Sequence, residues 1–295
     1  MPGFAVAGRR RSGSDPEQTR SNVMDRNTIS FDQAAADGLR TVLPAARNAT
    51  EAVILAAGRG SRLKQFTEAK PKCFAEVGGA PLIEHQLRAL EMAGIERVSV
   101  VTGYRHDDVR RAVRGRARVI RNEDWSDTNS LYSLSLCRGR VSGPMLVMNC
   151  DVLIHPLALQ RLVDAPGSAF LYDSSSGDAD EHMKVELAGD GRLKAMSKTL
   201  PADRTHGENV GVLHFDSAAA KTLFREAACV LAEGDRNAWM ARAVERAARS
   251  VPLRGVNVAD LPWIEIDFPD DLERARTQVW RHIAHALAPS VRLAA

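Results

Sequence analysis

The chain has 295 residues, of which 44% are hydrophobic, 26% charged and 5% aromatic. This balance excludes a chain that is disordered throughout, and the net charge of +3 is too small for a dedicated nucleic-acid binder. No apolar run approaches the roughly 18 residues that a membrane helix requires, so we expect neither nucleic-acid nor membrane partners.

The first 50 residues differ in composition from the rest of the chain. Residues 1–26 are rich in Arg, Ser and Gly and lack the apolar segment of a secretory signal, so we expect a disordered tail, with Met24 as an alternative start. Residues 27–50 carry a weak helical pattern, which predicts a leader helix that packs on the main domain or on another subunit. A homodimer is therefore left open. We expect one folded domain over residues 51–287 and a short tail over residues 288–295.

The cysteines are scattered along the chain, without a C-x-x-C pair or a metal-ligand spacing. Scattered thiols are typical of small buried side chains in a reducing compartment. We therefore expect a cytoplasmic protein. The four cysteines are Cys73, Cys137, Cys150 and Cys229.

From residue 51 onward, short apolar strands alternate with amphipathic helices. Residues 52–55 form a continuous apolar run that ends at a glycine-rich turn, which is typical of a buried parallel strand. The alternation, with its short connections, predicts βαβ units in a Rossmann-like, doubly wound, mostly parallel sheet of the α/β class. The further strands expected in this half are 97–102, 119–120 and 144–149, and the helices are 81–93, 107–113 and 130–137.

The pattern changes at about residue 168, where strands follow one another with turn residues between them. The Gly-Asp-Gly turn at 189–191 predicts a hairpin, so we expect an antiparallel insertion in the sheet. Pro269 suits the first position of a final helix, because two acidic residues follow it where the helix dipole favours anions. The expected strands are 168–173, 183–188, 193–197, 210–215 and 263–266, and the helices are 217–232, 237–248 and 269 to about 286.

The loop after the first strand, LAAGRGSRL at 55–63, carries the most informative motif, and Lys70-Pro71-Lys72 follows it. Its backbone N–H groups can bind phosphates, Arg62 can hold phosphate oxygens through its guanidinium, and Lys72 can offer a point charge. A dinucleotide fingerprint would need glycine in place of Leu63, and the chain has no Walker A string. The expected nucleotide-binding residues of the loop are Leu55, Ala56, Ala57, Gly58, Gly60 and Ser61.

These motifs, followed by Gly79-Ala80-Pro81-Leu82-Ile83, strongly resemble those of the nucleotidyltransferases that make nucleoside-diphosphate sugars and alcohols. The resemblance covers about residues 51–285 and implies a nucleotide-diphospho-sugar transferase-like fold. It also implies that the loop binds the triphosphate, that Arg62 stabilises the pyrophosphate leaving group, and that Lys72 bridges the α-phosphate and the incoming phosphate.

Acidic residues follow two of the expected strands. Asp151 lies at the carboxyl end of strand 144–149, the edge where open α/β sheets bind ligands. Glu265 and Asp267 share one face of the last strand because side chains alternate. Nucleotidyl transfer requires Mg²⁺, and the family resemblance assigns its binding to Asp151 and Asp267. Glu265 is a further candidate, although an ion pair would explain it nearly as well.

A second resemblance narrows the nucleotide. The segment 122–134, NEDWSDTNSLYSL, is similar to a pattern in the cytidylyltransferases that act on phosphocholine, inositol phosphate and 2-aminoethylphosphonate. It implies that Asn129 and Ser130 help to recognise cytosine. Amide and hydroxyl groups suit the donors and acceptors of that base. A helix N-cap role for one of the residues 128–130 is equally expected and does not exclude a ligand.

The acceptor pocket is predicted from the same subgroup. Glu181-His182-Met183-Lys184 and Ser197-Lys198 resemble segments on adjacent strands that line it, so both lysines are candidates for a phosphate or phosphonate dianion. Asp173 and Glu208 are candidates for an ammonium group. We interpret His182 as a surface or packing residue rather than a base. We expect Trp239 and Trp263 to be core residues. The alternative is that they form an aromatic wall for a quaternary amine.

The sequence thus predicts a Mg²⁺-dependent cytidylyltransferase that transfers CMP from CTP to a small phosphonate or phosphorylated alcohol. The acceptor itself is left open. One alternative is a sugar-1-phosphate nucleotidyltransferase that uses another NTP, and a second is an inactive nucleotide-sensing regulatory subunit. The joint presence of Arg62, Lys72, Asp151 and Asp267 argues against the sensor, which would not need metal ligands.

Overall fold

The computed structural model describes residues 50–63, 65–177 and 179–287. The expected N-terminal tail, the leader helix up to residue 49 and the C-terminal tail therefore lie outside the described residues. Among the helices that the structure does describe, none has the length and apolar character needed to cross a lipid bilayer.

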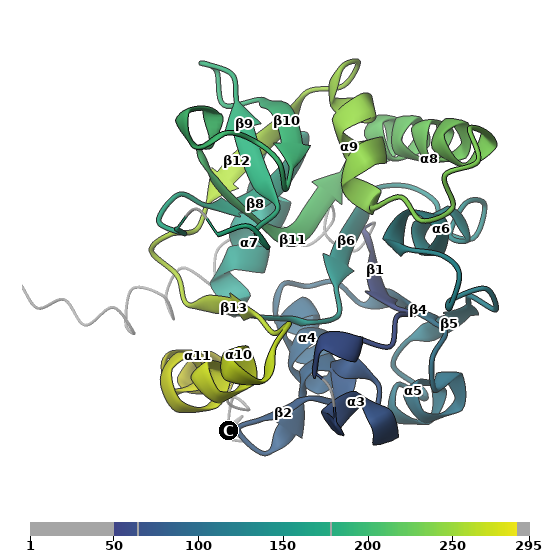
Figure 1. Cartoon of the computed structure of the whole chain (residues 1–295), viewed down its shortest axis with the longest axis vertical. Helices are drawn as coiled ribbons and strands as arrows, with labels where there is room; N and C mark the ends of the chain where they lie inside the picture. The colour runs from purple at the N-terminus through teal and green to yellow at the C-terminus, as the bar shows by residue number, and fades with distance from the viewer. Residues whose placement is uncertain (1–49, 64, 178, 288–295) are drawn as a thin grey trace, which may run out of the picture.

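A nine-stranded sheet forms the centre of the molecule, in the order β10-β9-β11-β6-β1-β4-β5, with β8 also paired to β11 and β12 paired to β8 (Figure 1). Strands β6, β1, β4 and β5 are parallel. Their carboxyl ends therefore meet at one edge of the sheet, where the loop after β1 and the turn after β6 lie side by side. These strands are β1 (Glu51–Ala56), β4 (Arg97–Thr102), β5 (Arg118–Arg121) and β6 (Met145–Asn149).

The expected antiparallel insertion is present beyond β6. Strand β11 runs antiparallel to β6, β8 and β9, and β10 runs antiparallel to β9, whereas β12 returns parallel to β8. Two small sheets, β2–β3 and β7–β13, lie outside the main one. The strands are β2 (Glu76–Val77), β3 (Ala80–Pro81), β7 (Val152–Ile154), β8 (Ser168–Asp173), β9 (Lys184–Leu187), β10 (Leu193–Ser197), β11 (Gly207–Phe215), β12 (Leu253–Asn257) and β13 (Trp263–Glu265).

Both faces of β1 are buried, which explains its continuous apolar sequence. Ala52 and Ile54 belong to the core under α4, α7 and the C-terminal helices, whereas Val53 and Leu55 belong to the core under α6, α8 and α9. The helices are α3 (Gln65–Ala69), α4 (Leu82–Met92), α5 (His106–Ala112), α6 (Ser130–Ser135), α7 (Pro156–Asp164), α8 (Ser217–Ala232), α9 (Met240–Ala248), α10 (Pro269–Arg274) and α11 (Trp280–Leu287).

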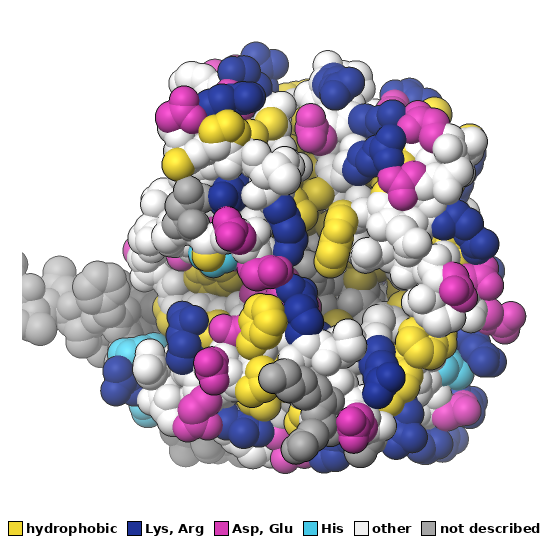
Figure 2. Space-filling model, in the orientation of Figure 1, with side chains coloured by type: hydrophobic (Ala, Val, Ile, Leu, Met, Phe, Trp, Pro, Cys, Tyr) yellow, Lys and Arg dark blue, Asp and Glu magenta, His cyan; other side chains and the backbone are white. Residues whose placement is uncertain are grey.

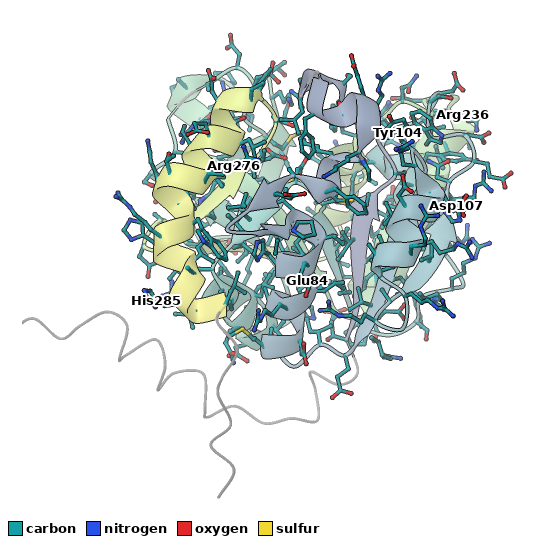
Figure 3. The ribbon with its side chains drawn as sticks, turned by 90° about the horizontal axis from the view of Figure 1, so that it is seen from below. Glu84, Tyr104, Asp107, Arg236, Arg276 and His285 are labelled. Atoms are coloured by element: carbon teal, nitrogen blue, oxygen red, sulfur yellow. The ribbon has the colours of Figure 1, made fainter. Side chains whose placement is uncertain are left out.

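The C-terminal helix covers one flank of the molecule, with α4 beside it and α5 on the opposite flank (Figure 3). The sequence predicts one continuous helix from Pro269 to about residue 286, but a π-helical segment at Ala275–Val279 separates α10 from α11. Its first residue, Ala275, is buried against the core. The helix that we expected at 237–248 begins only at Met240, because the backbone N–H of Met240 donates to Ser130 Oγ across the site at 2.9 Å.

His214 gives the fold a specific acid sensitivity. It lies on β11 with only 8% of its surface exposed, and its Nδ1 is buried without a hydrogen-bond partner among the described residues. Burial lowers the pKa of the folded ring below its ordinary value of 6.5, and contacts with Gly167 and Asp216 offset this only in part. The unfolded chain therefore takes up a proton near pH 6.5 while the folded chain does not.

Stability should accordingly be full above about pH 6.5 and fall below it, by at most about 1.4 kcal/mol per pH unit. Urea unfolding at pH 7.5, 6.5 and 5.5 measures this slope. His214→Gln should flatten it, whereas His285→Gln, on the exposed flank in Figure 3, should leave it unchanged. Equal slopes in all three proteins would contradict the assignment.

Candidate active site

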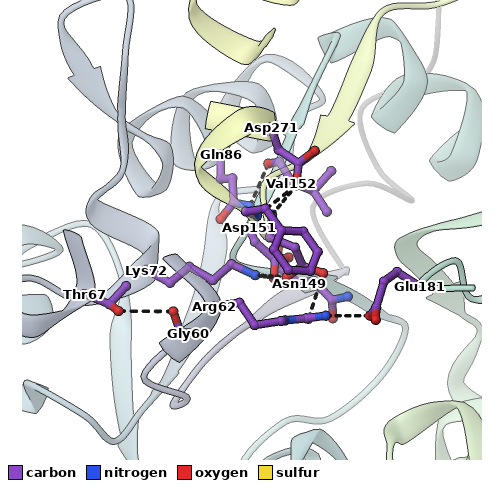
Figure 4. Close-up of polar contacts among 12 residues, drawn as sticks. Gly60, Arg62, Thr67, Lys72, Gln86, Asn149, Asp151, Val152, Glu181 and Asp271 are labelled. Atoms are coloured by element: carbon purple, nitrogen blue, oxygen red, sulfur yellow. Dashed lines mark hydrogen bonds and ion pairs between the residues drawn. The ribbon is translucent and has the colours of Figure 1, made fainter. Parts of the chain in front are cut away.

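The glycine-rich loop follows β1 and leads into a short 3₁₀ turn at Ser61–Leu63. Gly60 has a φ of +71°, and a Cβ at this position would lie 2.8 Å from the Cβ and Cδ atoms of Lys72. Thr67 Oγ1 donates to the Gly60 carbonyl at 3.1 Å, as Figure 4 shows. Glycine is therefore required here, because the loop turns sharply and the Lys72 side chain runs directly against its backbone.

Lys72 is the centre of a buried ion-pair network. Its Nζ lies 2.5 Å from Asp151 Oδ2 and also contacts Asp267 Oδ1, while Arg62 Nη2 lies 2.7 Å from Asp267 Oδ2. Figure 4 shows Lys72 reaching Asp151 from the loop side. Four residues that the sequence predicted for the site, from segments as far apart as Arg62 and Asp267, are thus joined by direct contacts.

Backbone contacts fix the two carboxylates at the same edge. Gln86 of α4 donates its amide to the carbonyls of Asn149 and Val152, at 2.8 and 2.9 Å, and so holds the turn that carries Asp151. The pairing of β13 with β7 continues to the N–H of Ile266, which donates to the Asp151 carbonyl at 3.0 Å. The sheet edge therefore places the residue after β13 beside the turn after β6.

The carboxylates of this network shift the pKa values of the neighbouring titratable groups. Burial alone would lower the pKa of Lys72, but the adjacent Asp151 and Asp267 outweigh it and raise the pKa above its ordinary value, so the lysine remains charged. Burial, followed by repulsion from the same two carboxylates, raises the pKa of Glu265 to about 8. The two cations Lys72 and Arg62 thus face the carboxylates of Asp151 and Asp267, and Glu265 is mostly protonated at neutral pH.

A further acidic group lies next to this network. Glu208 is 7% exposed, and its Oε2 lies 3.4 Å from Nδ1 of His182. Burial raises the pKa of Glu208, and the charge of His182 offsets this only in part. Asp173 pairs with Glu208 in the β8–β11 register and accepts the indole N–H of Trp263 at 2.8 Å. Burial alone would raise the pKa of Asp173, but hydrogen bonds from Ser175 and Trp263 outweigh it and lower the pKa.

Glu181 spans the entrance of the site. Its carboxylate accepts from Arg62 Nη1 at 2.7 Å and from Lys198 Nζ at 3.1 Å. The Lys198 ammonium lies 5.5 Å from the ring centre of Trp239, and the Arg62 guanidinium lies 5.3 Å from that of Phe268. The expectation that Trp239 is a core residue is wrong: 48% of its surface is exposed, because it flanks the pocket rather than a helix–sheet interface. Trp263, by contrast, packs on the core.

The segment before α6 is fixed by a buried amide. Asn122 donates to Thr128 Oγ1 and Ser133 Oγ, both at 3.1 Å, and accepts the N–H of Asp124. Asn129 is the N-cap of α6, as expected for one residue of this segment. The hydroxyl of Ser130 accepts from Met240. These hydrogen bonds fix the position of the segment that precedes α6.

A cavity of about 240 Å³ lies between the glycine-rich loop, the turn after β6 and the starts of α6 and α9. Figure 2 shows its face of the molecule, where charged and hydrophobic side chains gather around a hollow near the middle. The candidates that line it are Leu55, Ala57, Gly58, Gly60, Arg62, Lys72, Asn129, Ser130, Asp151, Lys198, Glu265 and Asp267.

Other candidates lie outside the lining: Ala56 is buried beneath the loop, Ser61 begins the 3₁₀ turn, and Asp173, Lys184 and Glu208 lie behind the wall on β8, β9 and β11. The sequence reasoning assigned no role to Trp125, Glu181, Met183, Met196, Asn209 and Met240, which also line the cavity. Most of them lay within or beside a segment that the sequence had singled out: Trp125 in 122–134, Glu181 and Met183 in the Glu-His-Met-Lys segment, Met196 next to Ser197-Lys198, and Asn209 next to Glu208. Met240 had no such signal.

Asp151 and Asp267 fit a magnesium ion. Asp151 Oδ1 is buried and has no hydrogen-bond partner among the described residues, so one hard oxygen ligand is unused. No group of three or more His, Cys, Asp or Glu side chains in the described part of the chain forms a metal site by itself. Mg²⁺ is commonly held by one or two carboxylates together with substrate phosphates, which matches this pair.

Comparisons with known proteins identify the chain's relatives. The model of a family described as the MobA-like NTP transferase domain matches residues 52–207. A bifunctional IPC transferase and DIPP synthase from Aquifex aeolicus is 28% identical, over 76% of this chain and 50% of the relative. A CMP-5′-(3-aminopropyl)phosphonate synthase from Streptomyces rubellomurinus is 30% identical, over 76% of this chain and 38% of the relative. The chain therefore spans half or less of the length of these two relatives.

Solved structures bear out the fold. The inositol-1-phosphate CTP transferase from T. maritima superimposes with a TM-score of 0.67 at 22% identity, covering 83% of this chain and 98% of that one. The chain has the nucleotide-diphospho-sugar transferase-like α/β fold, in which the parallel centre of the sheet continues into antiparallel strands.

Proposed function

Because the chain belongs to the family of MobA-like NTP transferase domains, we propose that it is a Mg²⁺-dependent cytidylyltransferase. It would transfer CMP from CTP to a small phosphonate or phosphorylated alcohol and release pyrophosphate. The observation that carries the proposal is the convergence of Lys72, Arg62, Asp151 and Asp267 in one cavity beside the glycine-rich loop. The Streptomyces relative, named for a CMP-linked aminopropylphosphonate, supports this choice.

The chemistry needs positioning and charge neutralisation more than a protein nucleophile. A phosphate or phosphonate oxygen of the acceptor is already anionic and attacks the α-phosphorus of CTP. The bond from that phosphorus to the bridging oxygen then breaks, and its electrons leave with pyrophosphate. Lys72 and Arg62 would offset the charge on the transferring and leaving phosphates. When bound to Asp151 and Asp267, Mg²⁺ would supply further positive charge to the phosphate oxygens.

Cysteine chemistry does not compete with this mechanism. Cys150 lines the cavity, but burial raises the pKa of its thiol well above the ordinary value, so it stays protonated. All four cysteines are free thiols. Scattered unpaired cysteines are typical of proteins that act in a reducing compartment, and we propose the cytoplasm as the place of action.

For the nucleotide, we propose that cytosine lies between the glycine-rich loop and the start of α6. Asn129 and Ser130 face the cavity there, and Trp125 adds an aromatic surface. Gly103 makes this arrangement possible, because a Cβ at that position would lie 2.4 Å from Trp125 Cβ. The ordered amide and hydroxyl groups supply donors and acceptors for a base edge.

For the acceptor, we propose a compound that carries an ammonium group as well as its phosphorus oxyanion. Glu265 lines the cavity, and Asp173 and Glu208 pair in the β8–β11 register behind its wall. A cationic ligand group would offset the cost of burying these carboxylates in their charged form. An uncharged sugar would not.

The test is pyrophosphate release with Mg²⁺, measured for four NTPs against 2-aminoethylphosphonate, phosphocholine, inositol 1-phosphate and glucose 1-phosphate. We expect turnover only with CTP and a preference for the two aminated acceptors. Turnover restricted to glucose 1-phosphate with another NTP would instead make the protein a sugar-nucleotide enzyme. CTP binding without turnover on any acceptor would favour a nucleotide sensor.

A further inference from the structure

The carboxylate of Glu181 occupies a position that two cations share. Arg62 Nη1 and Lys198 Nζ approach the same atom, Glu181 Oε2, at 2.7 and 3.1 Å. The three residues come from the nucleotide loop, from the segment before β9 and from the residue after β10. Figure 4 shows the Arg62 end of this contact reaching across the site. Two converging cations define a binding position for an anion.

Both cations are held in place without Glu181. Arg62 is also bound to Asp267 through its other terminal nitrogen, at 2.7 Å, and it packs on Phe268. Lys198 packs over the ring of Trp239. Trp239 and Phe268 are the two large hydrophobic side chains that remain exposed in the described part of the chain. The cation pair is therefore built into the entrance, and its geometry does not depend on the bridging carboxylate.

Glu181 itself is weakly held. Its side chain is 55% exposed, and exposed ion pairs contribute little to stability because water and salt screen them. Glu186 provides a contrast within the same fold: it also binds two cations, Lys194 and Arg204, but its side chain is only 7% exposed. When the Glu181 carboxylate leaves Arg62 and Lys198, it can turn into solvent and stay hydrated. Another anion can therefore replace it at low cost.

We propose that Arg62 and Lys198 form a subsite for a tetrahedral phosphorus oxyanion, and that Glu181 fills this subsite until the anion displaces it. The ligand class is a phosphate or phosphonate dianion with several terminal oxygens, which can accept from a guanidinium and an ammonium together. The assignment of this anion to a substrate rests on the proposed function. Its source is either the acceptor or the pyrophosphate portion of the nucleotide.

Calorimetric titration of the full-length protein, without nucleotide or metal at 0.15 M salt, tests the proposal. Methylphosphonate and inorganic phosphate probe the acceptor group, and pyrophosphate probes the nucleotide portion. Glu181→Gln keeps the shape of the side chain and removes its charge, so it should bind the oxyanion about fivefold more tightly than wild type. Lys198→Met should bind it about fivefold more weakly. The probe with the larger change identifies the source.

Asp180→Asn is the matched control, because it removes the same charge from the neighbouring exposed residue, which has no ion-pair partner in the described part of the chain. We expect a change of less than about twofold, since screening weakens effects at a distance. Equal tightening in both variants would overturn the proposal, because it would show a general charge effect. Weaker binding by Glu181→Gln would also overturn it, since Glu181 would then be a clamp that orients the cations.

The two proposals fail separately. If wild type turns over no CTP but Glu181→Gln still tightens oxyanion binding, only the cytidylyltransferase assignment is wrong. If turnover with CTP stands and Glu181→Gln behaves like Asp180→Asn, only the displaceable-carboxylate assignment is wrong.

Discussion

Replacing Lys72 with methionine should reduce kcat/KM for CTP-dependent pyrophosphate release roughly 100- to 1,000-fold, on the order of 3–4 kcal/mol of transition-state stabilisation. Methionine keeps much of the buried stem but removes the ammonium. The loss is expected to be large because the 7% exposed side chain offers its charge in a site from which water is mostly excluded. Steady-state kinetics with the best acceptor of the substrate matrix measures it.

Lys70→Met is the matched control for this experiment. Lys70 lies two positions earlier and pairs with Glu76 at 2.9 Å, but both side chains are about half exposed. We expect a change within about twofold, as is usual for a surface pair. If Lys72→Met retained most of its kcat/KM, charge neutralisation by this lysine would be wrong as a mechanism.

Local sequence patterns predicted much of the fold because each strand and helix in question has a regular apolar period. The strands 97–102, 168–173 and 193–197 and the helix 217–232 begin and end where the sequence indicated. One amphipathic helix with a local signal, α7, was missed although Pro156 begins it. Two strands that escaped prediction depend on distant contacts. β7 has three residues and exists through its pairing with β13, and β12 contains a glycine and pairs in parallel with β8. Neither has a local signal strong enough to predict it.

The residues of the site show the same difference between local motifs, which can be predicted, and distant contacts, which cannot. Lys72, Asp151 and Asp267 were predicted because motifs mark them and strand ends bring them to one edge. The position of Trp239 could not be inferred, because its exposure results from the late start of α9 at Met240. Nor could the contacts of Glu181, because they depend on where an irregular segment lies between two strands. Sequence thus located the charges but not the surfaces that surround them.

Asp151→Asn should reduce kcat/KM roughly 100-fold or more, a loss similar to that expected for Lys72→Met. The substitution removes a proposed metal ligand and one of the two partners of Lys72. Asparagine keeps the size of the side chain and one oxygen. Asp260→Asn is the control: it alters an exposed carboxylate that pairs with Arg161, away from the cavity. We expect that variant to stay within about twofold of wild type.

A metal-binding measurement separates the role of Lys72 from that of Asp151. The variants Lys72→Met and Asp151→Asn should change the affinity for a divalent cation in opposite directions. Lys72 now contacts both carboxylates, so its ammonium competes with any divalent cation there. Mn²⁺ binding to the nucleotide-free protein, followed by electron paramagnetic resonance, should therefore strengthen in Lys72→Met and weaken in Asp151→Asn. If both variants lost Mn²⁺ binding alike, the lysine would be supporting the carboxylates rather than occupying the metal's place. If neither variant changed Mn²⁺ binding, the metal would bind elsewhere. The predicted losses of kcat/KM in the two variants would not be contradicted by that result.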